Sequence, residues 1–153
     1  MRTQKRLVVE QLERRLGHFS EAGKIPIPDK GWICHIRTSL NMTMEQLGLK
    51  LNKTKQAVKR IESSEVSGTI SLNLLREAGS GMGMRLVYGF VPISGSVNKL
   101  IEDKARLLAE KIVLRANHNM LLENQATSQE SVQRSIRELA DELKREMKKS
   151  IWD

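Results

Sequence analysis

The chain has 153 residues, of which 26 are Lys or Arg and 18 are Asp or Glu, giving a formal net charge of +8 at pH 7. This length accommodates one compact domain with an appendage or two small helical domains, and the positive charge favours a polyanionic partner. A single cysteine excludes an intrachain disulfide and favours a reducing, cytoplasmic location; no apolar run is long enough for a membrane span, and 3% aromatic residues is too few for base-stacking platforms.

The first predicted element is an amphipathic helix over residues 3–21, in which apolar residues recur at spacings of three and four. Gly23 and the sequence IPIPD end this helix, because each proline disfavours α geometry in the residue before it. We therefore interpret residues 1–28 as an N-terminal helical arm with a linker.

Residues 29–83 are predicted to form a compact domain of four helices. Its first helix spans about residues 30–40, with Asp29 as the expected N-cap, and its fourth spans residues 70–78 before a glycine-rich stop.

The segment between these helices, residues 42–62, has the pattern of two short helices joined by a tight turn. Thr43 and Thr54 are the predicted N-caps, the first of them in a capping box. A helix-turn-helix needs a very small side chain where the helices cross, which Gly48 supplies, and a turn residue that tolerates positive φ, for which Asn52 is suited.

The second helix of this pair has a basic face, and no acidic residue interrupts residues 50–60. Residues 1–67 carry 13 Lys and Arg against 7 Asp and Glu, whereas residues 68–153 carry 13 against 11. A solvated helix face normally interleaves both signs of charge, so this one favours contact with DNA. Arg can pair with guanine and Gln with adenine in the major groove. The residues expected to read base edges are Lys55, Gln56, Lys59 and Arg60.

Residues 85–93 change the periodicity. This segment, RLVYGFVPI, is rich in β-branched and aromatic residues and too short for a helix, so it predicts a strand. A lone strand leaves its backbone groups unpaired, and the same strand from a second copy is the simplest partner. We therefore expect an antiparallel ribbon across a two-fold axis, with residues 84–95 as the dimerisation strand. Its pairing residues are Leu86, Val87, Tyr88, Phe90 and Val91.

Residues 96–153 are helical again. Two amphipathic runs, 96–122 and about 130–147, are joined by a polar turn at residues 124–129. This pattern predicts a helical hairpin or two helices of an intermolecular bundle, used for dimerisation or for binding a partner protein. The predicted fold class is therefore mainly all-α, with one short dimerisation strand and a C-terminal helical hairpin.

No set of residues predicts catalysis. The three histidines lie on separate predicted elements, and no nucleophile–base pair or metal-ligand spacing is found. The glycine-rich residues 80–83 follow a helix and lack the Gly-Lys-Ser/Thr ending of a phosphate loop, so they predict a helix stop. We expect a protein that is not an enzyme and that needs no metal or cofactor.

Over about residues 30–82 the chain resembles the helix-turn-helix family of phage repressors and their xenobiotic-response-element relatives. The resemblance implies a bundle of four or five helices and, in most members, a dimer. It implies base-edge contacts at Lys55, Gln56 and Arg60, with Lys59 beside them, and a buried structural ion pair between Arg37 and Glu62. The implied phosphate contacts are Thr43, Lys50, Lys53 and Thr54.

The order WI..IR.SL.MT.EQL, then V..IE..E..GTISL..L, then LVYGFVP is similar to the mobile mystery protein A group. These are helix-turn-helix antitoxins encoded beside a Fic-domain partner, so the resemblance implies an antitoxin and autorepressor of a toxin-antitoxin system. It implies transcription regulation by a homodimer on an inverted-repeat operator in double-stranded DNA. The motif with which Fic inhibitors often act, Ser or Thr, three residues, Glu, then Gly or Asn, is not found here. A second hypothesis is a protein-binding inhibitor that masks a partner enzyme with its arm and C-terminal helices.

Overall fold

The computed structural model describes residues 2–123 and 128–153. Within these residues the chain forms seven α-helices and two short 3-10 helices and contains no strand, which confirms the mainly all-α expectation. Internal contacts divide the chain into two compact units, Lys24–Tyr88 and a second made of Met1–Gly23 with Gly89–Asp153. Each unit is described by itself.

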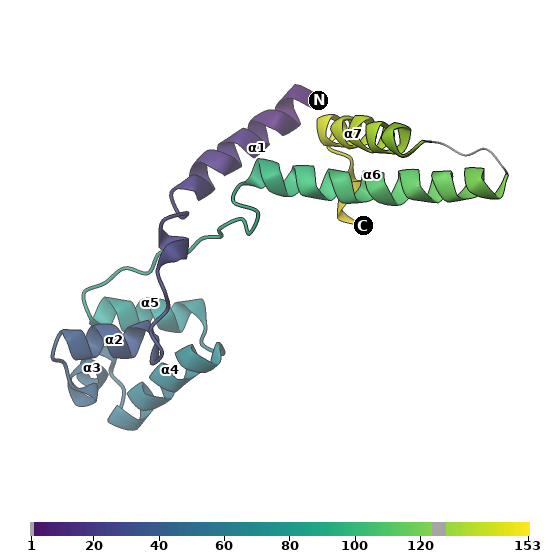
Figure 1. Cartoon of the computed structure of the whole chain (residues 1–153). Helices are drawn as coiled ribbons and strands as arrows, with labels where there is room; N and C mark the ends of the chain where they lie inside the picture. Colours follow the sequence, from purple (N-terminus) through teal and green to yellow (C-terminus); the bar gives the residue numbers. More distant parts are fainter. Residues whose placement is uncertain (1, 124–127) are drawn as a thin grey trace. The chain divides into compact units, whose positions relative to one another are not determined.

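The unit Lys24–Tyr88 is a bundle of four helices, drawn in blue and teal in Figure 1. They are α2 (Gly31–Ser39), α3 (Met44–Leu51), α4 (Lys55–Ser67) and α5 (Leu72–Gly81). One apolar cluster holds them together, because each helix turns an apolar stripe inward. Its buried members are Ile33, Leu47, Val58, Ile61, Ala78 and Met82.

Three of these helices begin at a hydroxyl residue that caps the first turn. The side chains of Thr43, Thr54 and Ser71 each accept a hydrogen bond from the backbone N–H three residues on. The Gln46 side-chain oxygen in turn accepts a hydrogen bond from the backbone N–H of Thr43, which completes the predicted capping box. Asn52 closes α3 in the left-handed region with φ 52°, as its sequence position predicts.

The start of α2 differs from the sequence-based expectation. Asp29 is not the N-cap; that position belongs to Lys30, which makes no side-chain capping bond. Instead, the Glu65 carboxylate on α4 accepts hydrogen bonds from the backbone N–H groups of Trp32 (2.8 Å) and Ile33 (2.9 Å). Gly31 leaves room for it, because a Cβ atom there would lie 2.8 Å from Glu65.

The second unit is built on a helical hairpin, α6 (Val97–Leu122) and α7 (Gln129–Glu146), drawn in green and yellow in Figure 1. Residues 124–127 of the predicted turn lie outside the described residues. A terminal 3-10 helix, η2 (Lys149–Trp152), packs on α6. The buried members of this core are Val97, Ile101, Ala105, Ala109, Val132, Ile136, Leu143 and Ile151.

Helix α1 (Arg2–Gly17) belongs to the same unit, because it packs against α6. Val9 and Leu16 of α1 lie against the hairpin core, and the Glu13 carboxylate accepts a hydrogen bond of 3.0 Å from the backbone N–H of Asn98. The 3-10 helix η1 (Ala22–Lys24) follows. Helix α1 therefore shares a core with residues far along the chain.

The predicted strand is not formed in this single chain. Residues 84–92 have neither helical nor strand structure, and the backbone N–H groups of residues 85–91 make no hydrogen bond within the described residues. The physical reason is that no second strand is available to pair with them. The segment does pack against other residues; for example, the Phe19 ring lies 2.7 Å from the position of a Cβ atom on Gly89.

Candidate nucleic-acid interface

The eight residues predicted to contact DNA lie at the N-cap of α3, on α3, in the turn after it and on α4, within the unit Lys24–Tyr88. Seven of them are exposed and Lys53 is half-buried. The caps place these residues, because Thr43 and Thr54 fix where α3 and α4 begin. The basic residues of this group, Lys50, Lys53, Lys55, Lys59 and Arg60, together with Gln56, are called the basic face below.

Helix α4 separates its two sides sharply. Val58 and Ile61 are buried in the core, whereas Gln56, Lys59 and Arg60 are exposed to solvent. This separation follows from the 3.6-residue period of an α-helix. The chain therefore presents a polar, cationic helix surface supported from behind by a packed core.

An ion pair joins the N-terminal ends of the two helices. Lys55 Nζ lies 2.8 Å from Glu45 Oε1, and both side chains are more than half exposed. The hydrogen bond from Lys55 holds the pKa of the Glu45 carboxyl below its usual range. Glu45 would therefore compete with any incoming anion for the charge of Lys55.

A second, looser pair involves Lys53, whose Nζ lies 3.9 Å from Glu77 Oε2 on α5. In the described part of the chain, no acidic side chain lies within ion-pair distance of Lys50, Lys59 or Arg60. Three of the five cations of the basic face are thus uncompensated. A polyanion would meet their charge directly, without breaking an internal pair.

The expected pair between Arg37 and Glu62 is present behind this surface. Arg37 Nε donates to Glu62 Oε1 at 2.6 Å, and a second guanidinium nitrogen donates to Oε2 at 3.2 Å. A third bond of 2.9 Å runs to the carbonyl of Met42, just before α3. The bond to Glu62 raises the pKa of Arg37, and both residues are buried. The pair joins α2, the start of α3 and α4, so its role is to hold the bundle together.

The side chains assigned to the dimerisation strand remain largely open to solvent. Val87, Tyr88, Phe90 and Val91 are exposed, with Phe90 at 79%, and Leu86 is half-buried. The Arg76 guanidinium lies 5.8 Å from the Tyr88 ring centroid, a cation–π contact. A continuous apolar, backbone-unpaired segment of this kind is suited to pairing with another chain.

Sequence reasoning missed the roles of three acidic side chains, Glu45, Glu65 and Glu77, whose partners lie on other elements. Glu45 and Glu77 meet lysines that lie ten or more residues away, and Glu65 acts on a helix more than thirty residues away. The periodicity of residues within one helix cannot predict contacts between side chains on different helices. A weak signal exists for Glu45, because the helix dipole favours an acidic residue in the first turn.

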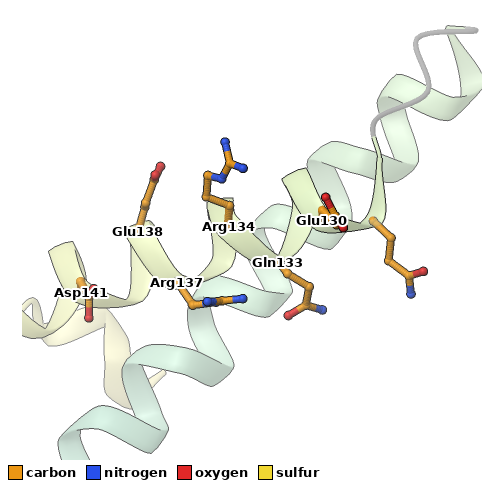
Figure 2. A pocket seen from close by; sticks show the side chains of 7 residues that line it. Glu130, Gln133, Arg134, Arg137, Glu138 and Asp141 are labelled. Atoms are coloured by element: carbon orange, nitrogen blue, oxygen red, sulfur yellow. The ribbon is translucent and has the colours of Figure 1, made fainter.

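Shallow hollows are present on the described surface. The one in Figure 2 is lined by seven side chains of α7 alone, and Arg134 and Glu138 extend away from the helix. Side chains from one helix cannot enclose a ligand. The lining residues, of mixed charge, are Gln129, Glu130, Gln133, Arg134, Arg137, Glu138 and Asp141.

Among the described residues, no cluster of three or more His, Cys, Asp or Glu side chains could hold a metal ion. None of the helices in that part of the chain combines the length and the apolar character needed to cross a bilayer. Comparisons with protein-family models, with curated proteins and with solved structures find no match to this chain.

Proposed function

We propose that this protein is a homodimeric, sequence-specific DNA-binding repressor of transcription. In this proposal α3 and α4 are the two helices of a helix-turn-helix, and α4 lies in the major groove. The observation that carries the proposal is the basic face, in which Lys50, Lys59 and Arg60 have no acidic partner in the described residues. Such a surface matches the phosphate charge of a duplex and the width of its major groove.

Within that surface the side chains differ in what they can recognise. Arg60 can donate two hydrogen bonds to a guanine, and Gln56 can pair with an adenine, so these two are assigned to base readout together with Lys55 and Lys59. Thr43 and Thr54 stand at helix N-termini, where hydroxyl and backbone N–H groups favour phosphate oxygens. Lys50 and Lys53 add charge beside them.

The dimer is proposed to form through residues 84–95. Support comes from the unpaired backbone of residues 85–91 and from the exposed side chains of Val87, Tyr88 and Phe90. Pairing with the same segment of a second copy would satisfy these groups and cover the apolar side chains. Two copies related by a two-fold axis would read an inverted repeat.

The biological setting is proposed to be a toxin-antitoxin pair, with this chain as the cytoplasmic antitoxin and autoregulator of a Fic-type toxin. The support is the resemblance of the motifs between residues 32 and 92 to the mobile mystery protein A group. A neighbouring reading frame that encodes the Fic motif HPFxxGNG is the expected observation, and its absence would contradict this part.

Selection of bound duplexes from a random-sequence pool tests the DNA-binding proposal. The wild-type protein is expected to enrich an inverted repeat whose half-site centres lie about 10 base pairs, or a multiple of that, apart. Gln56→Ala/Arg60→Ala should retain its helical circular dichroism but lose the enrichment. A folded wild-type protein that enriches nothing, or a double variant that enriches the same repeat, would contradict the proposal.

A second candidate function is inhibition of a partner enzyme by protein binding. One observation favours it: Leu7, Val8 and Leu12 of α1 remain exposed although α1 packs on α6 through other residues. Replacement of all three by Glu should abolish binding of the toxin in co-purification and leave DNA binding intact. Loss of DNA binding alone would contradict this second role.

A further inference from the structure

Helix α6 carries a stripe of leucines that the fold of the single chain does not cover. Leu107, Leu114 and Leu121 are 59%, 53% and 53% exposed, although α6 buries Ile101, Ala105 and Ala109 in the hairpin core. The three leucines are seven residues apart, so they recur after nearly two full turns and share one side of the helix.

Charged residues between the leucines also recur seven residues apart. An acidic residue followed at once by a basic one stands between residues 100 and 107, Asp103 with Lys104, and again between residues 107 and 114, Glu110 with Lys111. Half-buried Leu100 begins the series, so leucine recurs at residues 100, 107, 114 and 121. On a helix, the residues four before and three before a leucine flank it on opposite sides. The stripe therefore has an acidic edge and a basic edge.

The acidic edge and the basic edge differ in whether their charges are paired within the chain. Asp103 and Glu110 each form an ion pair with a basic residue four positions earlier on α6. Lys99 pairs with Asp103 and Arg106 with Glu110, each at 3.1 Å. Lys104 and Lys111 have no acidic side chain within ion-pair distance among the described residues. The basic edge is thus open to an acidic partner.

We propose that this stripe is a seam along which α6 pairs in parallel with α6 of a second copy of this chain. A seven-residue apolar repeat is the period at which two helices stay in contact along a left-handed supercoil. In a parallel pair related by a two-fold axis along the helices, the acidic edge of one copy lies beside the basic edge of the other. In an antiparallel pair, like-charged edges would meet. The charge pattern therefore selects both the occupant and its direction.

The leucine stripe of α6 shares no residue with the segment 84–95, and pairing along it does not depend on DNA binding. With one leucine per seven residues the seam is narrower than that of a two-position zipper, and its charged edges provide the remaining complementarity. Its stability should therefore decrease as salt concentration rises.

Disulfide trapping in the full chain, with Cys34→Ser as background, tests the seam. Leu107→Cys and Leu114→Cys, each examined alone, are both expected to form intermolecular disulfides under mild oxidation. Ala116→Cys, an exposed position on the other side of α6, is the matched control and should not. An antiparallel pair would give at most one of the two disulfides, because the sites lie about 10 Å apart along the helix; that result would overturn the parallel arrangement.

A charge exchange supplies the second test. On the Leu114→Cys background, one variant carries Asp103→Lys/Glu110→Lys and the other Lys104→Glu/Lys111→Glu. Each alone should lose most of its disulfide-linked dimer, and an equal mixture should recover it. Disulfide yields unaffected by these charges would overturn the seam.

Sedimentation equilibrium separates this inference from the proposed function. A wild-type dimer that persists without disulfide formation at residues 107 and 114 would overturn the α6 seam and leave a dimer through residues 84–95 standing. A wild-type chain that sediments as a single copy at all concentrations would overturn both.

Discussion

The backbone of Lys53 packs directly against Gly48, and the Lys53 N–H donates a 2.8 Å hydrogen bond to the Gly48 carbonyl. A Cβ atom added to Gly48 would lie 2.5 Å from the Lys53 carbonyl oxygen. This contact folds the chain back between α3 and α4. It sets the distance between the two helices that carry the basic face, because only a glycine permits so close an approach.

Gly48→Ala should therefore destabilise the unit Lys24–Tyr88 by about 1–3 kcal/mol, since the added methyl group must push backbone aside. Urea denaturation followed by circular dichroism measures the change. Gly17→Ala is the control, because a Cβ atom there meets nothing within 4 Å. Equal stability of the two variants would show that the turn relaxes freely.

Glu65→Ala should lower the free energy of unfolding by about 1–2 kcal/mol, because it removes the acceptor for two N–H groups at the start of α2. Asp29→Ala should have almost no effect, since Asp29 makes no capping bond. Thermal unfolding of both variants distinguishes the two residues. A larger loss of stability in Asp29→Ala than in Glu65→Ala would show that Asp29, and not Glu65, caps α2.

Removal of one partner of the buried pair should be costly. Glu62→Ala leaves the Arg37 guanidinium buried without its carboxylate and should cost about 3–5 kcal/mol. Arg37→Met/Glu62→Leu removes both charges and should be more stable than Glu62→Ala in urea denaturation. Because the pKa of Arg37 is raised, its contribution would be lost only as pH rises through that higher value, beyond the usual alkaline range. A double variant no more stable than the single one would contradict this account.

Arg60→Ala should weaken binding to the selected duplex by about 1–3 kcal/mol and relax preference at one base pair. Lys50→Ala should weaken all duplexes alike and reduce the slope of log affinity against log salt concentration by about 1. Fluorescence anisotropy with selected and scrambled duplexes measures both. If both variants changed affinity for the two duplexes in the same way, the assignment of Arg60 to base readout and of Lys50 to phosphate contact would be wrong.

Glu45→Gln should raise DNA affinity, because it releases Lys55 from a 2.8 Å ion pair. Glu77→Gln is the matched control and should do less, since its pair with Lys53 is 3.9 Å long. The pKa of Glu45 is lowered, so the carboxylate keeps its charge until the pH falls below the usual Glu range of about 4.3. The gain in affinity should therefore be constant between about pH 5.5 and pH 8. A gain that vanishes within that range would contradict the assignment.

Several local features could be predicted from sequence. The capping box at Thr43, the cap at Thr54 and the left-handed Asn52 depend on hydrogen bonds and backbone angles within four residues of each other. The pattern of apolar residues likewise predicted the hairpin of α6 and α7. Such signals are readable because the interacting groups lie close along the chain.

The sequence by itself determined the approximate positions of the helices, the caps at Thr43 and Thr54 and the cationic side of α4. Only the tertiary structure decided that Glu65 caps α2, that Glu45 holds Lys55, that α1 shares a core with α6, and that Leu107 and Leu114 stay uncovered. The physical reason is distance along the chain. A cap or a turn is fixed by neighbouring residues, whereas the partner of a charged or apolar side chain depends on which distant elements the packed core brings beside it.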